Sequence, residues 1–140
     1  MSTREIQLPR KLTNQLLHLA QMSPETEICG LIGADAQGLP VTCYPINNTA
    51  STPHNRFQLD SRQQISAMKT MRDQHQTLFA IYHSHPSAPA LPSVTDIEHA
   101  AYPEAIHLII SLNTQGVLEL RAFSITDQQV KALDLSLIES

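Results

Sequence analysis

Two histidines and one aspartate have a spacing that would let them share a metal ion. His83 and His85 lie two residues apart, and Asp96 follows after a proline-rich segment. Side chains at positions i and i+2 of a strand point to one face of a sheet, so the two imidazoles would point the same way. Two imidazoles and one carboxylate suit Zn²⁺ and leave a fourth tetrahedral position for water. These residues therefore predict a site for one zinc ion per chain.

Each of these residues also has a simpler explanation. A His-x-His pair alone is more often a packing or surface feature than a metal site. Ser93 could be only the N-cap of a helix, and Asp96 only an acid that favours the helix dipole. Thr95 and Glu98 would make an equally good capping box. None of these explanations accounts for the occurrence of the whole set.

The elements that must position these residues alternate between helices and strands. His83 and His85 follow an apolar run that predicts a strand, which Pro86 stops, and Ser93 or Thr95 begins the helix that carries Asp96. Helices are also expected over residues 12–21 and 61–74, and strands over residues 28–32, 41–46, 78–82, 106–112 and 117–123. This alternation predicts an α/β or α+β class.

Three smaller features complete the expected elements. Residues 57–59 alternate and could form a short strand, and residues 113–116 have the composition of a hairpin turn. The pattern of residues 133–137 does not separate helix from strand. In the helix over residues 61–74, the inner side is expected to carry Ile65, Met68 and Met71–Arg72.

Length, charge and cysteine count narrow the classes of function. The chain has 140 residues, which suits one domain over residues 1–140. Its net charge is −4 and it has no Lys/Arg cluster, so nucleic-acid binding is not expected. No stretch approaches the roughly 20 apolar residues of a membrane span, and the N-terminus has no secretory pattern. Cys29 and Cys43 are expected to be reduced core thiols, which favours a cytoplasmic protein.

The spacing around the two histidines resembles the JAMM (MPN+, or JAB-domain) metalloprotease family. That pattern is His-x-His-Pro, six residues, Ser, two residues and Asp, and it matches His83 through Asp96 without departure. The family also has a glutamate three residues before a glycine that opens the first core strand. Glu27 stands three residues before Gly30, whereas the neighbouring Glu25 has the wrong spacing. The resemblance spans about residues 5 to 125.

The resemblance implies a cytidine-deaminase-like sandwich, in which a mixed, mostly antiparallel sheet is flanked by helices. It also implies a zinc peptidase or isopeptidase that cuts after the C-terminal Gly-Gly of a ubiquitin-like protein. Because the chain leaves no room for a large insertion near the metal, a small sulfur-carrier protein is the favoured substrate. Two alternatives stay open: a non-catalytic MPN-type binding module, and a zinc-binding regulator without turnover.

The same resemblance gives roles to two further residues. Glu27 matches the general base, which takes a proton from water and passes it to the leaving amine. Ser93 would donate a hydrogen bond to the tetrahedral oxyanion. Taken alone, Glu27 is more simply a solvated acid in front of a strand. The strand that ends at His85 and the polar loop over residues 47–55 are expected to offer backbone edges to an extended substrate tail.

The remaining histidines are expected to have plainer positions. His99 is interpreted as a helix-face residue, and His107 as packed within a strand. His54 lies in the polar loop, where solvation is favoured over substrate contact. His18 and His75 are expected on helix surfaces.

Overall fold

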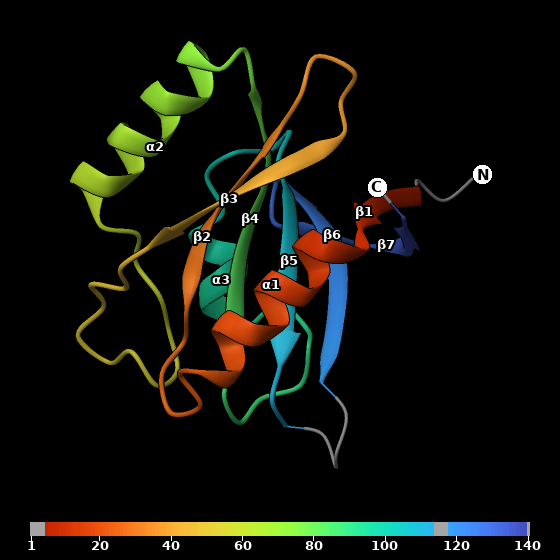
Figure 1. The fold of residues 1–140 in the computed structure, drawn as a ribbon. Coiled ribbons are helices and arrows are strands. Elements are labelled where there is room, and N and C mark those ends of the chain that lie inside the picture. The colour runs from red at the N-terminus through yellow and green to blue at the C-terminus, as the bar shows by residue number, and fades with distance from the viewer. Residues whose placement is uncertain (1–4, 114–117, 140) are drawn as a thin grey trace.

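One curled seven-stranded sheet organises the chain (Figure 1). The computed structural model describes residues 5–113 and 118–139, and within them it has seven strands and three helices. The strands are β1 (Glu5–Pro9), β2 (Cys29–Ala34), β3 (Pro40–Ile46), β4 (Thr77–His85), β5 (Ile106–Ser111), β6 (Glu119–Thr126) and β7 (Gln129–Ile138). Their order in the sheet is β1-β7-β6-β5-β4-β2-β3.

The sheet is mixed and mostly antiparallel, as expected. Only β1 with β7 and β4 with β5 are parallel among the adjacent pairs of described strands. The sheet curls so far that its two edge strands, β1 and β3, contact each other. The expected α/β class is thus confirmed, whereas the likeness to cytidine deaminases stays a prediction.

Helices α1 (Arg10–Gln21) and α2 (Ser61–Asp73) cover opposite faces of the sheet. Leu12 and Leu16 of α1 pack into one core cluster with Ala80 and Tyr82 of β4. Ala67 and Met71 of α2 pack into a second cluster with Leu31 and Ile81. Because side chains alternate along a strand, His83 and His85 lie on the Ile81 side, which is the α2 face. Among the described residues, no helix has the length and apolar character needed to cross a membrane.

Strand β4 lies inside the sheet and is paired along both edges up to its last residues. His83 is opposite Cys29 of β2 and Ile109 of β5, and His85 is opposite Ser111 of β5. Beyond the β2 ladder, the Ser84 backbone N–H still donates to the Ile28 carbonyl, at 3.1 Å. The expectation that this strand offers a free edge to a substrate tail is therefore wrong, because its backbone groups are already bonded.

Several expected elements differ from the observed ones. Strand β1 had no expected counterpart, and the undecided segment near residue 135 is strand β7, which pairs in parallel with β1. Residues 57–59 make only one isolated bridge, between Asn48 and Leu59. Ile65 and Arg72 were expected on the inner side of α2, but Ile65 is 70% exposed and Arg72 is also exposed. Most of the expected turn at residues 113–116 lies outside the described residues, although β5 and β6 do pair in antiparallel fashion.

Gly30 lets β2 approach its neighbours closely, and this approach generates a prediction. A Cβ added at Gly30 would collide with the Tyr82 hydroxyl and the Tyr44 carbonyl. At Gly33 it would meet only side-chain atoms, the nearest being the end of the Gln76 side chain, whose movement would shift its hydrogen bonds and no backbone group. Gly30→Ala is therefore expected to lower the free energy of unfolding by about 1–3 kcal/mol. Gly33→Ala should cost clearly less. Denaturant unfolding of both variants measures this, and equal losses would contradict the packing argument.

Candidate metal centre and active site

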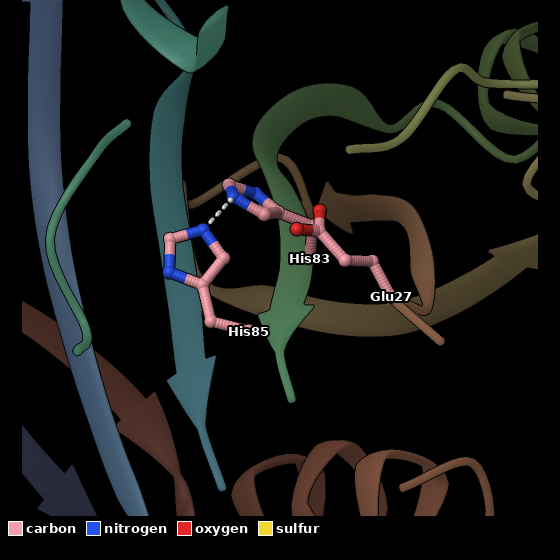
Figure 2. Close-up of side chains that lie close together, drawn as sticks. All are labelled: Glu27, His83 and His85. Carbon is pink, nitrogen blue, oxygen red and sulfur yellow. Dashed lines mark hydrogen bonds between the residues drawn. The ribbon is translucent and has the colours of Figure 1, made fainter. Parts of the chain in front are cut away.

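The carboxyl end of β4 holds two imidazoles in a buried position. His83 and His85 are only 1% and 2% exposed, and their Nε2 atoms lie 3.1 Å apart (Figure 2). Two residues on one face of a strand that is bonded on both sides have little freedom to separate. The expected arrangement of the two histidines on one face is therefore confirmed.

Asp96 completes the cluster from the first turn of α3 (Val94–Glu98). Its Oδ2 lies 3.0 Å from Nε2 of His83 and 3.2 Å from Nε2 of His85. The helix starts with a capping box: the Asp96 backbone N–H donates to the Ser93 hydroxyl, and the Ser93 backbone N–H donates to Oδ2 of Asp96. The capping box is therefore built from Ser93 and Asp96, and it also orients the Asp96 carboxylate toward the two histidines.

Contacts outside the cluster fix the orientation of both rings. Nδ1 of His85 donates to the Pro89 carbonyl at 2.8 Å, which directs Nε2 toward His83 and Asp96. The ring of Phe57 stacks on the ring of His83, with centroids 4.4 Å apart and planes 22° from parallel. Ser111 donates to the Ala88 carbonyl at 2.7 Å and so ties the segment after His85 to β5. The bond from His85 to a backbone carbonyl is the supporting contact that metal-binding histidines usually have, whereas His83 is held by stacking and its Nδ1 has no partner among the described residues.

Glu27 reaches the cluster from the residue pair that precedes β2. Its backbone is held by two bonds: its N–H donates to the Pro53 carbonyl at 2.7 Å, and its carbonyl accepts from the Asn48 side chain at 3.0 Å. The side chain is 4% exposed, and its Oε1 has no hydrogen-bond partner among the described residues. A carboxylate oxygen of Glu27 and ring nitrogens of His83 and His85 all lie within 4.8 Å of one another (Figure 2).

Charge is unevenly distributed over these side chains. Burial opposes ionisation of Asp96, but hydrogen bonds from the two imidazoles hold the pKa of this carboxyl well below its usual range. Burial lowers the pKa of His83, whereas for His85 the bonds to Asp96 and to the Pro89 carbonyl outweigh burial and raise the pKa. Burial raises the pKa of Glu27 to about 7, with a further increase from Asp96 and an opposing effect from His85.

This donor set fits a divalent metal ion. Three possible ligand atoms converge within 3.2 Å of one another: Nε2 of His83, Nε2 of His85 and Oδ2 of Asp96. Without a metal, the imidazole N–H groups make the hydrogen bonds that join the rings to the carboxylate. A cation that replaced those protons would find two neutral nitrogens and one negative oxygen. Glu27 is a second carboxylate that could complete the set, since Glu27, His83 and His85 also form a group with metal-binding spacing.

Sequence reasoning did not identify three residues that shape this region. Phe57 stacks on His83, and Arg56 and His107 line a cavity beside the cluster. His107 is buried as expected, but its Nε2 has no hydrogen-bond partner within the described part of the chain, and burial lowers its pKa to about 4. A lone histidine in an apolar strand pattern carries no signal for such a position.

The other candidate residues lie largely where they were expected. His99 is the C-cap of α3, and His18, His54, His75 and His99 are all exposed, although His75 lies in the turn after α2 and not on the helix itself. Cys29 is buried, and its thiol donates to the Ile46 carbonyl at 3.3 Å. Burial raises the pKa of this thiol to about 12, so it is protonated and has the expected core role.

Comparison with known proteins shows which family this chain is similar to. The family model for prokaryotic homologues of the JAB domain matches residues 9–126. The CysO-cysteine peptidase of Mycobacterium tuberculosis is 30% identical over 129 residues, which cover 91% of this chain and 88% of the peptidase. The desampylase of Haloferax volcanii is 33% identical over 89 residues, which are 63% of this chain and 64% of that protein, just under two thirds.

A solved structure has a similar fold. Protein DSY2949 from Desulfitobacterium hafniense has a TM-score of 0.86 and 33% identity, and the match covers 96% of this chain and 94% of that one. The family model and these relatives define the class of protein as a JAMM-type hydrolase. The chain belongs to the family of prokaryotic JAB-domain homologues.

The two carboxylates near the imidazoles generate a prediction about metal binding. Asp96→Asn removes the negative oxygen that is closest to both nitrogens, so affinity for a divalent transition-metal ion should fall by about tenfold or more. Glu27→Gln should leave that affinity within about threefold, since we expect Glu27 not to be a ligand. Titration against a chromophoric chelator measures both variants. Tight binding by Asp96→Asn together with loss in Glu27→Gln would reverse the two roles.

Proposed function

We propose that this chain is a zinc peptidase that hydrolyses the amide bond after the C-terminal Gly-Gly of a small ubiquitin-like or sulfur-carrier protein. One observation carries the proposal. Two imidazoles and the Asp96 carboxylate converge in a buried cluster, and beside them lies a second carboxylate, Glu27, whose Oε1 is unpaired within the described residues. In a cluster with a purely structural role, an unpaired buried oxygen would only destabilise the fold.

In this proposal one zinc ion is held by His83, His85 and Asp96. Two nitrogens and one oxygen favour zinc over Mg²⁺ or Ca²⁺, which prefer oxygen ligands throughout. The chemistry that zinc supplies in such sites is polarisation of the scissile carbonyl and a lowered pKa of water. The bond from His85 to the Pro89 carbonyl keeps Nε2 as the metal-facing nitrogen.

Glu27 is the general base and then the general acid. Burial raises its pKa to about 7, and a carboxyl group with a raised pKa is suited both to accept and to release a proton. It takes a proton from the attacking water and delivers it to the leaving amine. Its backbone bonds to Pro53 and Asn48 hold it beside the cluster while the side chain exchanges the proton.

Ser93 has two compatible roles. Its hydroxyl oxygen accepts the Asp96 backbone N–H at 3.0 Å, so it caps α3. A hydroxyl that accepts one hydrogen bond still has its own proton to donate. We assign that proton to the oxygen of the tetrahedral intermediate, where negative charge develops.

The depth of the site limits what reaches it. The three proposed ligands and Glu27 are between 1% and 8% exposed, so a folded surface cannot approach them. An extended tail that ends in two glycines is thin enough, because glycine has no side chain to clash. The relatives named CysO-cysteine peptidase and desampylase support a protein-conjugate substrate. A cytoplasmic location is part of the proposal, because Cys29 and Cys43 are free thiols.

The substrate assignment generates a prediction with a defined cleavage point. A β-grasp carrier joined through its terminal glycine to cysteine should release cysteine when incubated with the zinc-loaded protein. Glu27→Gln should keep its zinc and lose about 10²-fold in rate, because the amide cannot accept a proton. Mass spectrometry of the carrier gives the cut position, and elemental analysis gives the zinc content. Unselective digestion of casein, or full activity of Glu27→Gln, would contradict this assignment.

The two roles of Ser93 can be separated by substitution. Ser93→Ala should lower kcat by about 10²-fold with little change in KM, because a donor to the transition state is lost. It should also cost about 1 kcal/mol of stability through the lost cap. Ser93→Gly is the control, since glycine at an N-cap costs only a few tenths of a kcal/mol. If Ser93→Gly retains kcat, the hydroxyl has no catalytic role.

A further inference from the structure

Two cavities near the cluster share no lining residue: one is lined by His83 and Asp96, the other by Glu27. The first has a volume of about 520 Å³ and is lined by His83 and Asp96 together with residues of α2, of α3 and of the segment over residues 50–59. The second has a volume of about 660 Å³ and is lined by Glu27 and by residues next to β2 and β3. A cavity of several hundred Å³ is in the range of ligand sites in proteins.

The position of Glu27 indicates which part of a substrate each cavity would take. The leaving amine must lie within reach of Glu27, because this residue supplies its proton. The leaving group therefore continues over the second cavity, which Glu27 lines. The acyl part of the substrate leaves the cluster in the other direction, into the first cavity, where Glu27 is not among the lining residues.

The first cavity has an unbalanced charge. Arg56 is its only Lys or Arg side chain, and Arg56 has no ion pair within the described residues. Asp96 is its only carboxylate, and that group is engaged by two imidazoles and the Ser93 N–H. A guanidinium without a protein carboxylate beside it favours a carboxylate brought by the ligand.

The floor of this cavity also has an unused polar group. His107 lies on β5 opposite Ile81, two residues before the position opposite His83, and it is 4% exposed. Its Nε2 is one of the buried side-chain atoms without a hydrogen-bond partner in the described structure. On the cavity wall, Gln64 of α2 donates to the Tyr102 hydroxyl at 2.8 Å, so both of these polar groups have a partner in the protein.

We propose that the first cavity is the subsite for the carrier tail upstream of its two glycines, and that Arg56 selects a tail with an acidic side chain there. His107 binds the backbone of the same segment and is indifferent to its side chains. This inference rests on the proposed function for the direction of the substrate. It adds a specificity that neither the metal cluster nor Glu27 supplies.

The test compares tail peptides that differ in one side chain. The probes are synthetic peptides that end in Xaa-Gly-Gly-Cys-amide, with Glu, Gln or Lys as Xaa. Wild type should cleave the Glu peptide with a kcat/KM about tenfold above that of the Lys peptide, as a charge-assisted hydrogen bond would give. In Arg56→Gln the ratio should fall to within about twofold, while Arg56→Lys should keep most of it.

Two further variants separate charge selection from general binding. His107→Leu should weaken all three peptides alike and leave the Glu-to-Lys ratio unchanged, since its contact is with backbone. Arg72→Gln is the matched control, because Arg72 is exposed on α2 and does not line the cavity. It should behave as wild type. An unchanged ratio in Arg56→Gln, or no preference in wild type, would overturn the subsite.

A binding measurement tests the selection of an acidic side chain by Arg56 without requiring catalysis. Fluorescein-labelled versions of the three peptides are titrated into zinc-loaded Glu27→Gln, with and without Arg56→Gln, and anisotropy gives Kd. If the Glu peptide binds selectively and Arg56→Gln abolishes that selectivity, the subsite is supported even when no peptide is cut. In that case only the peptidase proposal would fail. Cleavage after Gly-Gly with equal Kd for all three peptides would leave the peptidase standing and reject the subsite.

Discussion

The clamping of β4 between β2 and β5 is the constraint on which the whole site depends. A strand bonded along both edges cannot shift its register without breaking two ladders, so the face on which His83 and His85 lie is fixed. The Ser93–Asp96 capping box then sets the third group from another element. The same hydrogen bonds that cap the start of α3 also orient the Asp96 carboxylate, so the helix cap and the site are built from the same residues.

Burial gives the cluster its chemistry and also a cost in stability. Oε1 of Glu27, Nδ1 of His83 and Nε2 of His107 are buried without hydrogen-bond partners in the part of the chain that is described. Such groups destabilise a fold by about 1–3 kcal/mol each unless something binds to them. The rest of the molecule offsets this through two apolar clusters, one under α1 and one under α2. These three groups lie in or beside the cluster, which is where the proposal places proton transfer and substrate contact.

The sequence predicted those parts of the fold and the site that depend on neighbouring residues. It missed those that depend on contacts between distant segments. The common face of His83 and His85 followed from strand alternation, and Asp96 followed from motif spacing, so both were predicted. Strand β1 was missed because its partner β7 is over a hundred residues away, and parallel pairing leaves no local pattern. Ile65 was placed inside from helical periodicity, but α2 buries only a narrow stripe around Ala67 and Met71. The cavity at Arg56 and His107 depends on how α2, α3 and a loop pack together, which no local pattern encodes.

The central claim is that His83, His85 and Asp96 are the ligands and that Glu27 is a free base. The most direct measurement is a crystal structure of the zinc-loaded protein with anomalous data collected on both sides of the zinc absorption edge. The account predicts one zinc peak per chain, at ligand distances of about 2.0–2.2 Å from both Nε2 atoms and from an Asp96 oxygen. Glu27 should lie outside that distance. A peak coordinated by Glu27 with Asp96 turned away, or no peak at the cluster, would contradict it.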